Sequence, residues 1–284
     1  MSAFSWSFMP IAGGYRTDRP LHQAASIAQS HFLPEGAYTT MRTVGGTGIL
    51  RWRQHLDRLE ETTALLGAPQ RLERDALQQM LCELLQELPW AGSSESRVRL
   101  TVTTDGAGRL WLSVEALTTP SEAEYRDGVA VLTRPLQRDN ARAKNSAFIA
   151  QSEALRALRE GPIHEVLMVG AAGTILEGID SNFFAVVAGR LYTADEGVLA
   201  GVTREMVLQE AHVDAGPVVL AALPLAALPT ISEAFISSTS RAILPVTEID
   251  GRAVGNGRPG PITLRLMRRL QQRLYAETTE MCPM

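Results

Sequence analysis

Helical periodicity is the first clear pattern along the chain. A short apolar strand at residues 48–50 is followed by the segment RWRQHLDRLEETTALLG (51–67). Its apolar positions recur every three or four residues, and Gly67 suits a helix C-cap. They are Leu56, Leu59, Thr63 and Leu66. A second helix is predicted after it, with an apolar side made of Leu77, Met80, Leu81, Leu84 and Leu85.

The period then changes from helical spacing to alternation. The segments VRLTVTT (98–104) and RLWLSVEAL (109–117) flank a glycine-rich turn at 105–108. Alternating strands around such a turn predict a β-hairpin. The polar stretch at 118–128 contains Pro120 and has no periodicity, so it reads as a connection. We therefore expect an N-terminal α/β domain over residues 1–119 and an interdomain linker over 120–128.

The second half mixes strands and helices, and we expect a C-terminal domain over residues 129–284. The apolar runs predict strands at 129–133, 165–169, 182–187, and around 217–222 and 234–238. Helices are expected from beyond Lys144 to about Glu160, from about Thr203, and from about Ile262.

Composition narrows the function classes. Of 284 residues, 45% are hydrophobic and 20% are charged, as expected for a globular protein. A net charge of −4 without any basic run argues against a nucleic-acid partner. No apolar run reaches the length of a membrane span, so we expect a cytoplasmic protein without a membrane partner. The two cysteines, Cys82 and Cys282, suggest neither a disulfide framework nor a metal site, which fits a reducing cytosol.

Lys144 is the only lysine among 27 basic residues; the others are arginines. A lysine amine can lose its proton and attack a carbonyl carbon, whereas a guanidinium stays protonated. A lysine that forms a Schiff base is therefore the first hypothesis for this position. The alternative is chance, which would leave one surface lysine without a role.

Three segments downstream of Lys144 carry further candidate chemistry. Glu177 lies in the apolar segment GTILEGIDSNFF (173–184) and needs a cationic partner there. GVLAGVTREM (197–206) opens a helix, whose backbone N–H groups at Val202 and Thr203 suit an anion such as phosphate. A hydroxyl-rich turn, SSTS (237–240), follows a strand. Each segment by itself is better interpreted as an ordinary turn or loop.

Together and in this order, the segments resemble the class IV aminotransferase family, the fold-type IV pyridoxal-phosphate enzymes. The resemblance rests on GAYTTMR (36–42), HLDRL (55–59), ARAKNS (141–146), HEVLMVGAAGTILEGIDSNFF (164–184), GVTR (201–204) and SSTSRAILPV (237–246). It implies an α+β, two-domain fold with a smaller N-terminal α/β domain and a larger C-terminal pseudo-barrel domain. It also implies a homodimer and the cofactor pyridoxal 5'-phosphate.

The resemblance also implies residue roles. Lys144 forms the Schiff base with the cofactor, and Glu177 faces the pyridine nitrogen. The phosphate is held by Arg58, Val202, Thr203 and Thr239, while Leu199 packs on the ring. The alternative for Arg58 is an ion pair with Glu61 on a solvated helix face.

The chain departs from the family at the substrate side. Phe148 and Ile149 occupy the region where many members have a tyrosine, and Thr104 stands where several relatives have an arginine that binds the substrate carboxylate. The segment at 25–35 also departs from the usual run. We expect Arg241, with the amides of Thr239 and Ser240, to bind the carboxylate instead, and Arg97 or Arg99 as the next candidates. Tyr38 and Thr40 are further expected substrate contacts.

These features predict an aminotransferase that moves an amino group between an amino acid and a 2-oxo acid. The alternative is 4-amino-4-deoxychorismate lyase, which releases pyruvate, because the paired threonines of GAYTT resemble that subgroup. A third reading is a family member without catalytic activity. Retention of Lys144, Glu177, Arg58 and Thr203 speaks against that reading.

Overall fold

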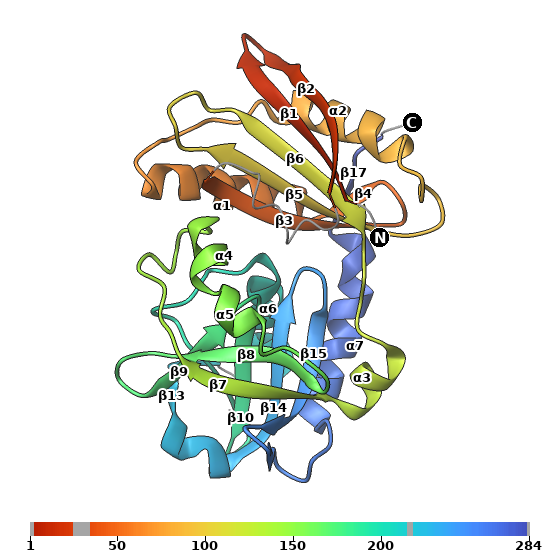
Figure 1. The fold of residues 1–284 in the computed structure, drawn as a ribbon. Coiled ribbons are helices and arrows are strands. Elements are labelled where there is room, and N and C mark those ends of the chain that lie inside the picture. The colour runs from red at the N-terminus through yellow and green to blue at the C-terminus, as the bar shows by residue number, and fades with distance from the viewer. Residues whose placement is uncertain (1–2, 25–34, 215–217, 283–284) are drawn as a thin grey trace. The chain divides into compact units, whose positions relative to one another are not determined.

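The computed structural model describes residues 3–24, 35–214 and 218–282, and these residues form two compact units (Figure 1). The first unit comprises residues 1–118, 143–147 and 274–284, and the second comprises 119–142 and 148–273. Most of the 25–35 segment that departs from the family lies outside the described residues.

A seven-stranded sheet forms the frame of the first unit, in the order β17-β4-β3-β5-β6-β1-β2. Neighbouring strands are antiparallel. The strands are β1 (Ala3–Ile11), β2 (Gly14–Ala24), β3 (Gly36–Val44), β4 (Gly48–Leu50), β5 (Ser96–Thr103), β6 (Leu110–Ala116) and β17 (Thr278–Glu280). The hairpin predicted from the alternating pattern is therefore present as β5 and β6.

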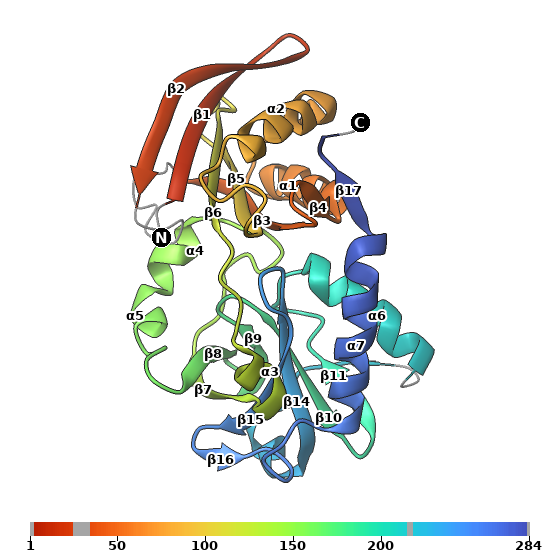
Figure 2. The same ribbon diagram turned by 90° about the vertical axis from the view of Figure 1, so that its right-hand side faces the viewer.

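Two helices cover one face of this sheet, α1 (Trp52–Leu65) and α2 (Arg74–Gln86), as Figures 1 and 2 show. The leucines predicted for their buried faces contribute to the core, with Leu56, Leu59 and Leu77 fully buried and Leu66 partly buried. Gly67 follows α1 with φ +77°, and its N–H donates to Ala64 O, which agrees with the expected helix end.

Cys82 of α2 and Cys282 beyond β17 form a disulfide, so the expectation of no disulfide is wrong. They are 200 residues apart in the sequence, and spacing alone gave no sign that pairing of β17 with β4 brings the C-terminal segment to α2. Cysteine usage therefore gives no support for a reducing compartment.

Strand pairing in the second unit closes on itself. β10 pairs with β14, β14 with β15, β15 with β7, β7 with β8, β8 with β9, and β9 with β10 again. This closed path is the pseudo-barrel expected from the sequence. The strands are β7 (Val129–Pro135), β8 (Ile163–Val169), β9 (Thr174–Gly178), β10 (Asn182–Val187), β11 (Arg190–Thr193), β12 (Val219–Leu220), β13 (Leu223–Pro224), β14 (Ile231–Ser238), β15 (Ala242–Ile249) and β16 (Arg252–Ala253).

The helices associated with the second unit are α3 (Glu122–Asp127), α4 (Ala147–Gln151), α5 (Glu153–Arg156), α6 (Val202–Asp214), η2 (Leu225–Thr230) and α7 (Pro261–Ala276). Figure 2 shows α6 and α7 side by side, where Arg273 donates to Glu210 at 2.7 Å.

The single helix expected between Lys144 and Glu160 is wrong, because the segment forms the two short helices α4 and α5. Between them, the Ser152 hydroxyl donates to Phe148 O at 2.7 Å. The backbone N of Ser152 also donates to Phe148 O, at 3.0 Å, so backbone bonding continues across the one residue that separates the two helices.

The two units divide the chain differently from the continuous domains expected from the sequence. The segment expected as a linker contains α3, which begins with a capping box between Ser121 and Glu124 and belongs to the second unit. Residues 143–147 bond to β3, and β17 pairs with β4, so both segments belong to the first unit.

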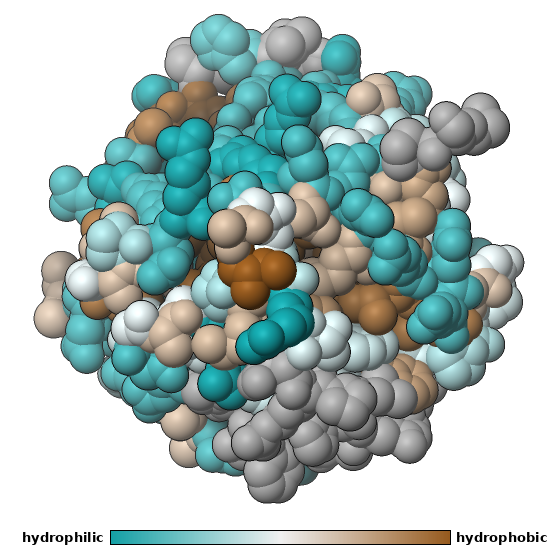
Figure 3. Space-filling view, turned by 90° about the horizontal axis from the view of Figure 1, so that it is seen from above, coloured by the Kyte–Doolittle hydropathy of each residue, from teal (hydrophilic) through white to brown (hydrophobic). Residues whose placement is uncertain are grey.

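Hydrophilic residues dominate the face seen in Figure 3, with smaller groups of apolar residues among them. Among the described residues, no helix has both the length and the apolar character needed to cross a membrane.

Candidate active site

The backbone around Lys144 is fixed by two elements of the first unit. Lys144 O accepts a hydrogen bond from Tyr38 N of β3 at 2.9 Å, and Lys144 N donates to Thr62 Oγ1 of α1 at 3.5 Å. Ser146 N donates to Gly36 O, and Gly36 N donates to Ser146 Oγ at 2.9 Å. Lys144 therefore lies beside β3, next to an isolated antiparallel bridge between Asn145 and Ala37, although the sequence placed it only before a helix.

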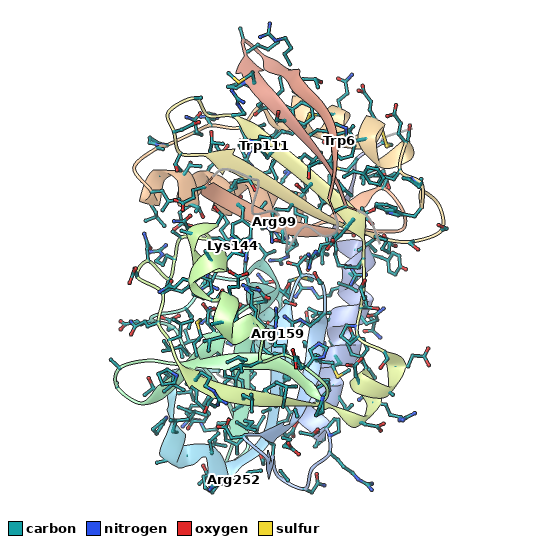
Figure 4. All side chains as sticks on the ribbon, in the orientation of Figure 1. Trp6, Arg99, Trp111, Lys144, Arg159 and Arg252 are labelled. Atoms are coloured by element: carbon teal, nitrogen blue, oxygen red, sulfur yellow. A yellow bond between two sulfur atoms is a disulfide. The ribbon has the colours of Figure 1, made fainter. Side chains whose placement is uncertain are left out.

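The Lys144 amine lies over an aromatic ring that it shares with a second cation, the guanidinium of Arg99. Figure 4 labels these two cationic residues. Lys144 Nζ is 4.8 Å from the centroid of the Tyr38 ring, and Arg99 Cζ is 4.7 Å from the same centroid. Register explains the grouping, because Tyr38 pairs with Thr101 and Thr40 with Arg99 on one face of the sheet. The face combines a primary amine with a guanidinium, which suits a ligand with a carbonyl and a negative charge.

Arg58 is buried in α1 and is oriented by Thr39. Its Nη2 donates to Thr39 Oγ1 at 2.8 Å, and Thr39 Oγ1 also lies 2.8 Å from His55 Nδ1. Burial, together with the positive charges of Arg58 and Lys144, holds the pKa of His55 well below its usual range. Because Arg58 is only 9% exposed, it does not lie on a solvated face as the ion-pair alternative with Glu61 requires.

A second group of candidate residues surrounds Glu177 in the second unit. Glu177 is 2% exposed, and its Oε1 accepts from Arg138 Nε at 2.9 Å. Its Oε2 accepts from Asn182 Nδ2 at 3.0 Å and from the backbone N of Leu199 at 3.1 Å. The cationic partner that the sequence required for Glu177 is thus Arg138. A carboxylate with three donors, one of them charged, is held in an environment suited to its ionised form.

Strand register and stacking build this group. Asn182 pairs directly with Glu177 between β10 and β9. The Arg138 guanidinium lies 3.6 Å from the centroid of the Phe148 ring and donates to Ile179 O at 3.1 Å. Phe148, the residue that departs from the family's usual tyrosine region, therefore packs against the partner of Glu177.

The start of α6 approaches the same carboxylate. Val202 and Thr203 form its first turn and are buried. A side chain at Gly201 would bring its Cβ to 2.2 Å from Asn182 Oδ1, so only glycine fits this approach. The first N–H groups of a helix have no acceptor within the helix, and they carry its positive end. This turn can bind an anion, as the sequence indicated.

The turn between β14 and β15 places Thr239 and Ser240 at half-buried positions and directs Arg241 to another partner. Arg241 Nη2 donates to the fully buried Glu165 at 2.9 Å, and Arg241 Nε donates to Ser238 Oγ at 3.2 Å. The buried Glu165 carboxylate compensates the Arg241 charge. This pairing speaks against the expected role of Arg241 in binding a substrate carboxylate.

Sequence reasoning missed four residues of these groups: Thr39, His55, Arg138 and Asn182. Asn182 carried a usable signal, since two polar residues five apart around a tight turn pair across antiparallel strands. Arg138 is one of two arginines in QRDNARA (137–143), and nothing in the pattern separates it from the other.

The candidate residues thus fall into two groups, one in each unit. The first offers an amine and a buried guanidinium, and the second offers a buried carboxylate and the N-terminus of a helix. The second unit also contains the closed barrel described above.

Comparison with known proteins agrees. Residues 36–249 match the family model described as amino-transferase class IV, and the chain belongs to this family. It is 26% identical over 271 residues to D-alanine aminotransferase of Bacillus licheniformis, and this alignment covers 87% of this chain and 90% of that protein. It is 27% identical over 242 residues to branched-chain-amino-acid aminotransferase of Pseudomonas aeruginosa, and this alignment covers 80% of this chain and 78% of that protein.

Among solved structures, the fold IV transaminase of Curtobacterium pusillum has a TM-score of 0.75 at 22% identity and covers 97% of this chain and 99% of that one. That likeness shows the fold. The family, the fold class and the assignment to an enzyme of the aminotransferase class, all predicted from the sequence, are confirmed.

Proposed function

We propose that this aminotransferase uses pyridoxal 5'-phosphate bound to Lys144 to move an amino group between an amino acid and a 2-oxo acid. The observation that carries the proposal is the setting of the chain's only lysine. Its backbone bonds to both β3 and α1, and its amine lies over the Tyr38 ring. Such fixing reduces the entropy that a reactive amine loses when it reaches its target.

The residues present fit this cofactor. When bound, pyridoxal 5'-phosphate supplies an electron sink that stabilises negative charge on the substrate Cα. Lys144 holds the cofactor and afterwards moves a proton at that Cα. Glu177 would keep the pyridine nitrogen protonated. Hydrogen bonds from Arg138 and Asn182 hold the Glu177 carboxylate in place for this role. Leu199 orients the same carboxylate through its backbone N–H.

Phosphate binding is proposed for Arg58, the first turn of α6 at Val202 and Thr203, and Thr239. Arg58 offers several N–H donors in one plane, which suits two phosphate oxygens better than a lysine would. The α6 turn adds backbone donors at the positive end of a 13-residue helix.

Arg99 replaces Arg241 as the proposed carboxylate ligand of the substrate. It is 9% exposed and lies on the same Tyr38 ring as Lys144. Arg97 is a weaker candidate, because Glu115 Oε1 lies 2.5 Å from its Nη2 and compensates its positive charge. Thr40 pairs with Arg99 across β3 and β5, which supports a place for Thr40 beside the substrate.

Transamination is favoured over the lyase reaction because both curated relatives described above are named aminotransferases. The homodimer and the cytoplasmic location expected from the sequence belong to this proposal as well.

In the test, single D- and L-amino acids are added to the purified protein loaded with pyridoxal 5'-phosphate. Conversion of the cofactor's absorbance to the pyridoxamine form, with release of the matching 2-oxo acid, supports transamination. D-Alanine and L-leucine are the first donors to try, following the names of the relatives. Pyruvate release from 4-amino-4-deoxychorismate without such conversion would instead indicate the lyase, and no reaction with any amino acid would contradict the proposal.

A further inference from the structure

A buried histidine in α1 has a hydrogen-bonding pattern that calls for an explanation. His55 and Thr39 are both fully buried, and His55 Nδ1 lies 2.8 Å from Thr39 Oγ1. The other ring nitrogen, Nε2, has no hydrogen-bond partner among the described residues. Burying an imidazole nitrogen without a partner costs free energy, so this arrangement needs a reason beyond packing.

Proton positions can be assigned from the bonding capacity of the three side chains. The Arg58 guanidinium only donates, and its Nη2 donates to Thr39 Oγ1 at 2.8 Å. The Thr39 hydroxyl proton then points to His55 Nδ1, which accepts it, and the ring proton is on Nε2. In the opposite tautomer, Nδ1 would donate to Thr39, and the Thr39 hydroxyl proton would have no acceptor within the described residues. The Nε2 lone pair would then also have no donor within them.

The three residues form one chain of donors that ends at a neutral acceptor. His55 precedes Arg58 by three residues, so both side chains lie on the same side of α1, facing Thr39 of β3. A donor chain of this kind is cooperative, because the guanidinium polarises the hydroxyl and strengthens its bond to Nδ1. A protonated His55 could not accept this bond, and it would repel the Arg58 cation.

We propose that Thr39 and neutral His55 are positioning residues that orient the Arg58 guanidinium toward the cofactor phosphate. The proposal rests on the phosphate role assigned to Arg58 above. An arginine side chain has several rotatable bonds, and ordering them on binding lowers affinity. Because one Nη already bonds to Thr39, much of that ordering is complete before the phosphate arrives.

The test compares two ligands of the apoprotein, pyridoxal 5'-phosphate and pyridoxal, which lacks the phosphate. The dissociation constant of pyridoxal divided by that of pyridoxal 5'-phosphate measures how much the phosphate contributes to affinity. We expect Arg58→Ala to reduce this ratio most, and Thr39→Val and His55→Leu to reduce it by about five- to twentyfold, as for a partly lost charged hydrogen bond. Thr39→Ser keeps the hydroxyl and should retain the wild-type ratio.

Thr63→Val is the matched control, because Thr63 is also buried in this unit and its hydroxyl bonds to Glu60 O instead of to Arg58. It should leave the ratio unchanged. In an Arg58→Ala background, Thr39→Val should have less than about a twofold further effect, since residues that act through one another are not additive.

Independent effects of Thr39→Val and Arg58→Ala would overturn the positioning role, as would a normal ratio in Thr39→Val. A normal ratio in Arg58→Ala would overturn the phosphate role of Arg58 and this inference with it. The tautomer has its own readout in the apoprotein: nitrogen-15 NMR of the His55 ring should show the proton on Nε2, and a proton on Nδ1 would contradict the assignment.

Discussion

Arg138→Met tests whether Glu177 depends on a buried cationic partner. The substitution keeps an unbranched side chain of similar reach but removes the charge. It deletes the bond of 2.9 Å to Glu177 Oε1, the bond of 3.1 Å to Ile179 O, and the stacking on Phe148. Glu177 keeps its bonds from Asn182 and Leu199.

The expected loss follows from the burial of the pair. The side chains of Arg138 and Glu177 are 5% and 2% exposed, so water cannot replace the missing partner. Removing one member of a buried ion pair typically costs about 3–5 kcal/mol of unfolding free energy. The matched control is Arg134→Met in β7, whose side chain is 40% exposed and lies 3.9 Å from Asp250, for which we expect less than about 1 kcal/mol.

The assay is urea unfolding of the apoprotein followed by circular dichroism, because all four tryptophans lie in the first unit and do not report on Arg138. A double variant with Glu177→Gln removes both charges. Its cost should be smaller than the sum of the single costs, with a coupling toward the upper end of about 0.5–3 kcal/mol. Equal costs for Arg138→Met and Arg134→Met, or strictly additive single costs, would refute the reasoning.

Three further predictions concern the first unit. Arg99→Gln should raise KM for the amino donor by about ten- to a hundredfold through loss of a charged hydrogen bond, while Arg97→Gln has a smaller effect; equal effects in steady-state kinetics would remove Arg99 from the substrate site. Because the pKa of His55 is lowered in the folded state, the unfolded state binds more protons below about pH 6.5. The stability that neutral His55 contributes should therefore be fully present above about pH 6.5. As pH falls below that value, the unfolding free energy should decrease by up to about 1.4 kcal/mol per pH unit. Stability curves of wild type and His55→Asn that run parallel between pH 5.5 and 6.5 would contradict this. The native protein should show no thiol to a disulfide-exchange reagent, and reduction or Cys82→Ser should lower the unfolding free energy by about 2–4 kcal/mol; two reactive thiols in the native protein would disprove the disulfide.

Elements with strong periodicity were predictable from the sequence. The apolar positions of α1 and α2 and the alternation of β5 and β6 match the structure, because one buried face imposes its period on the residues. Short strands that depend on distant partners were not predictable. β9 has five residues and is defined by pairing with β8, β10 and β13, and β17 is defined by pairing with β4.

The candidate site shows the same division. Lys144 stood out because it is unique, and Glu177 because a carboxylate in an apolar segment needs a cationic partner. The partners of both depend on tertiary contacts. Thr62 and Tyr38 bond to the Lys144 backbone only because α1 and β3 flank it, and the ion pair between Arg241 and Glu165 joins residues 76 apart in the sequence, which no local pattern encodes.

The most direct test of the central claim is covalent attachment of the cofactor to Lys144. The protein loaded with pyridoxal 5'-phosphate is treated with borohydride, which makes the linkage permanent, and its peptides are mapped by mass spectrometry. Because Lys144 is the only lysine, the label has one possible lysine target. The account predicts a pyridoxyl group on Lys144 and no label in Lys144→Arg. A label only on the N-terminal amine, or no label at all, would contradict it.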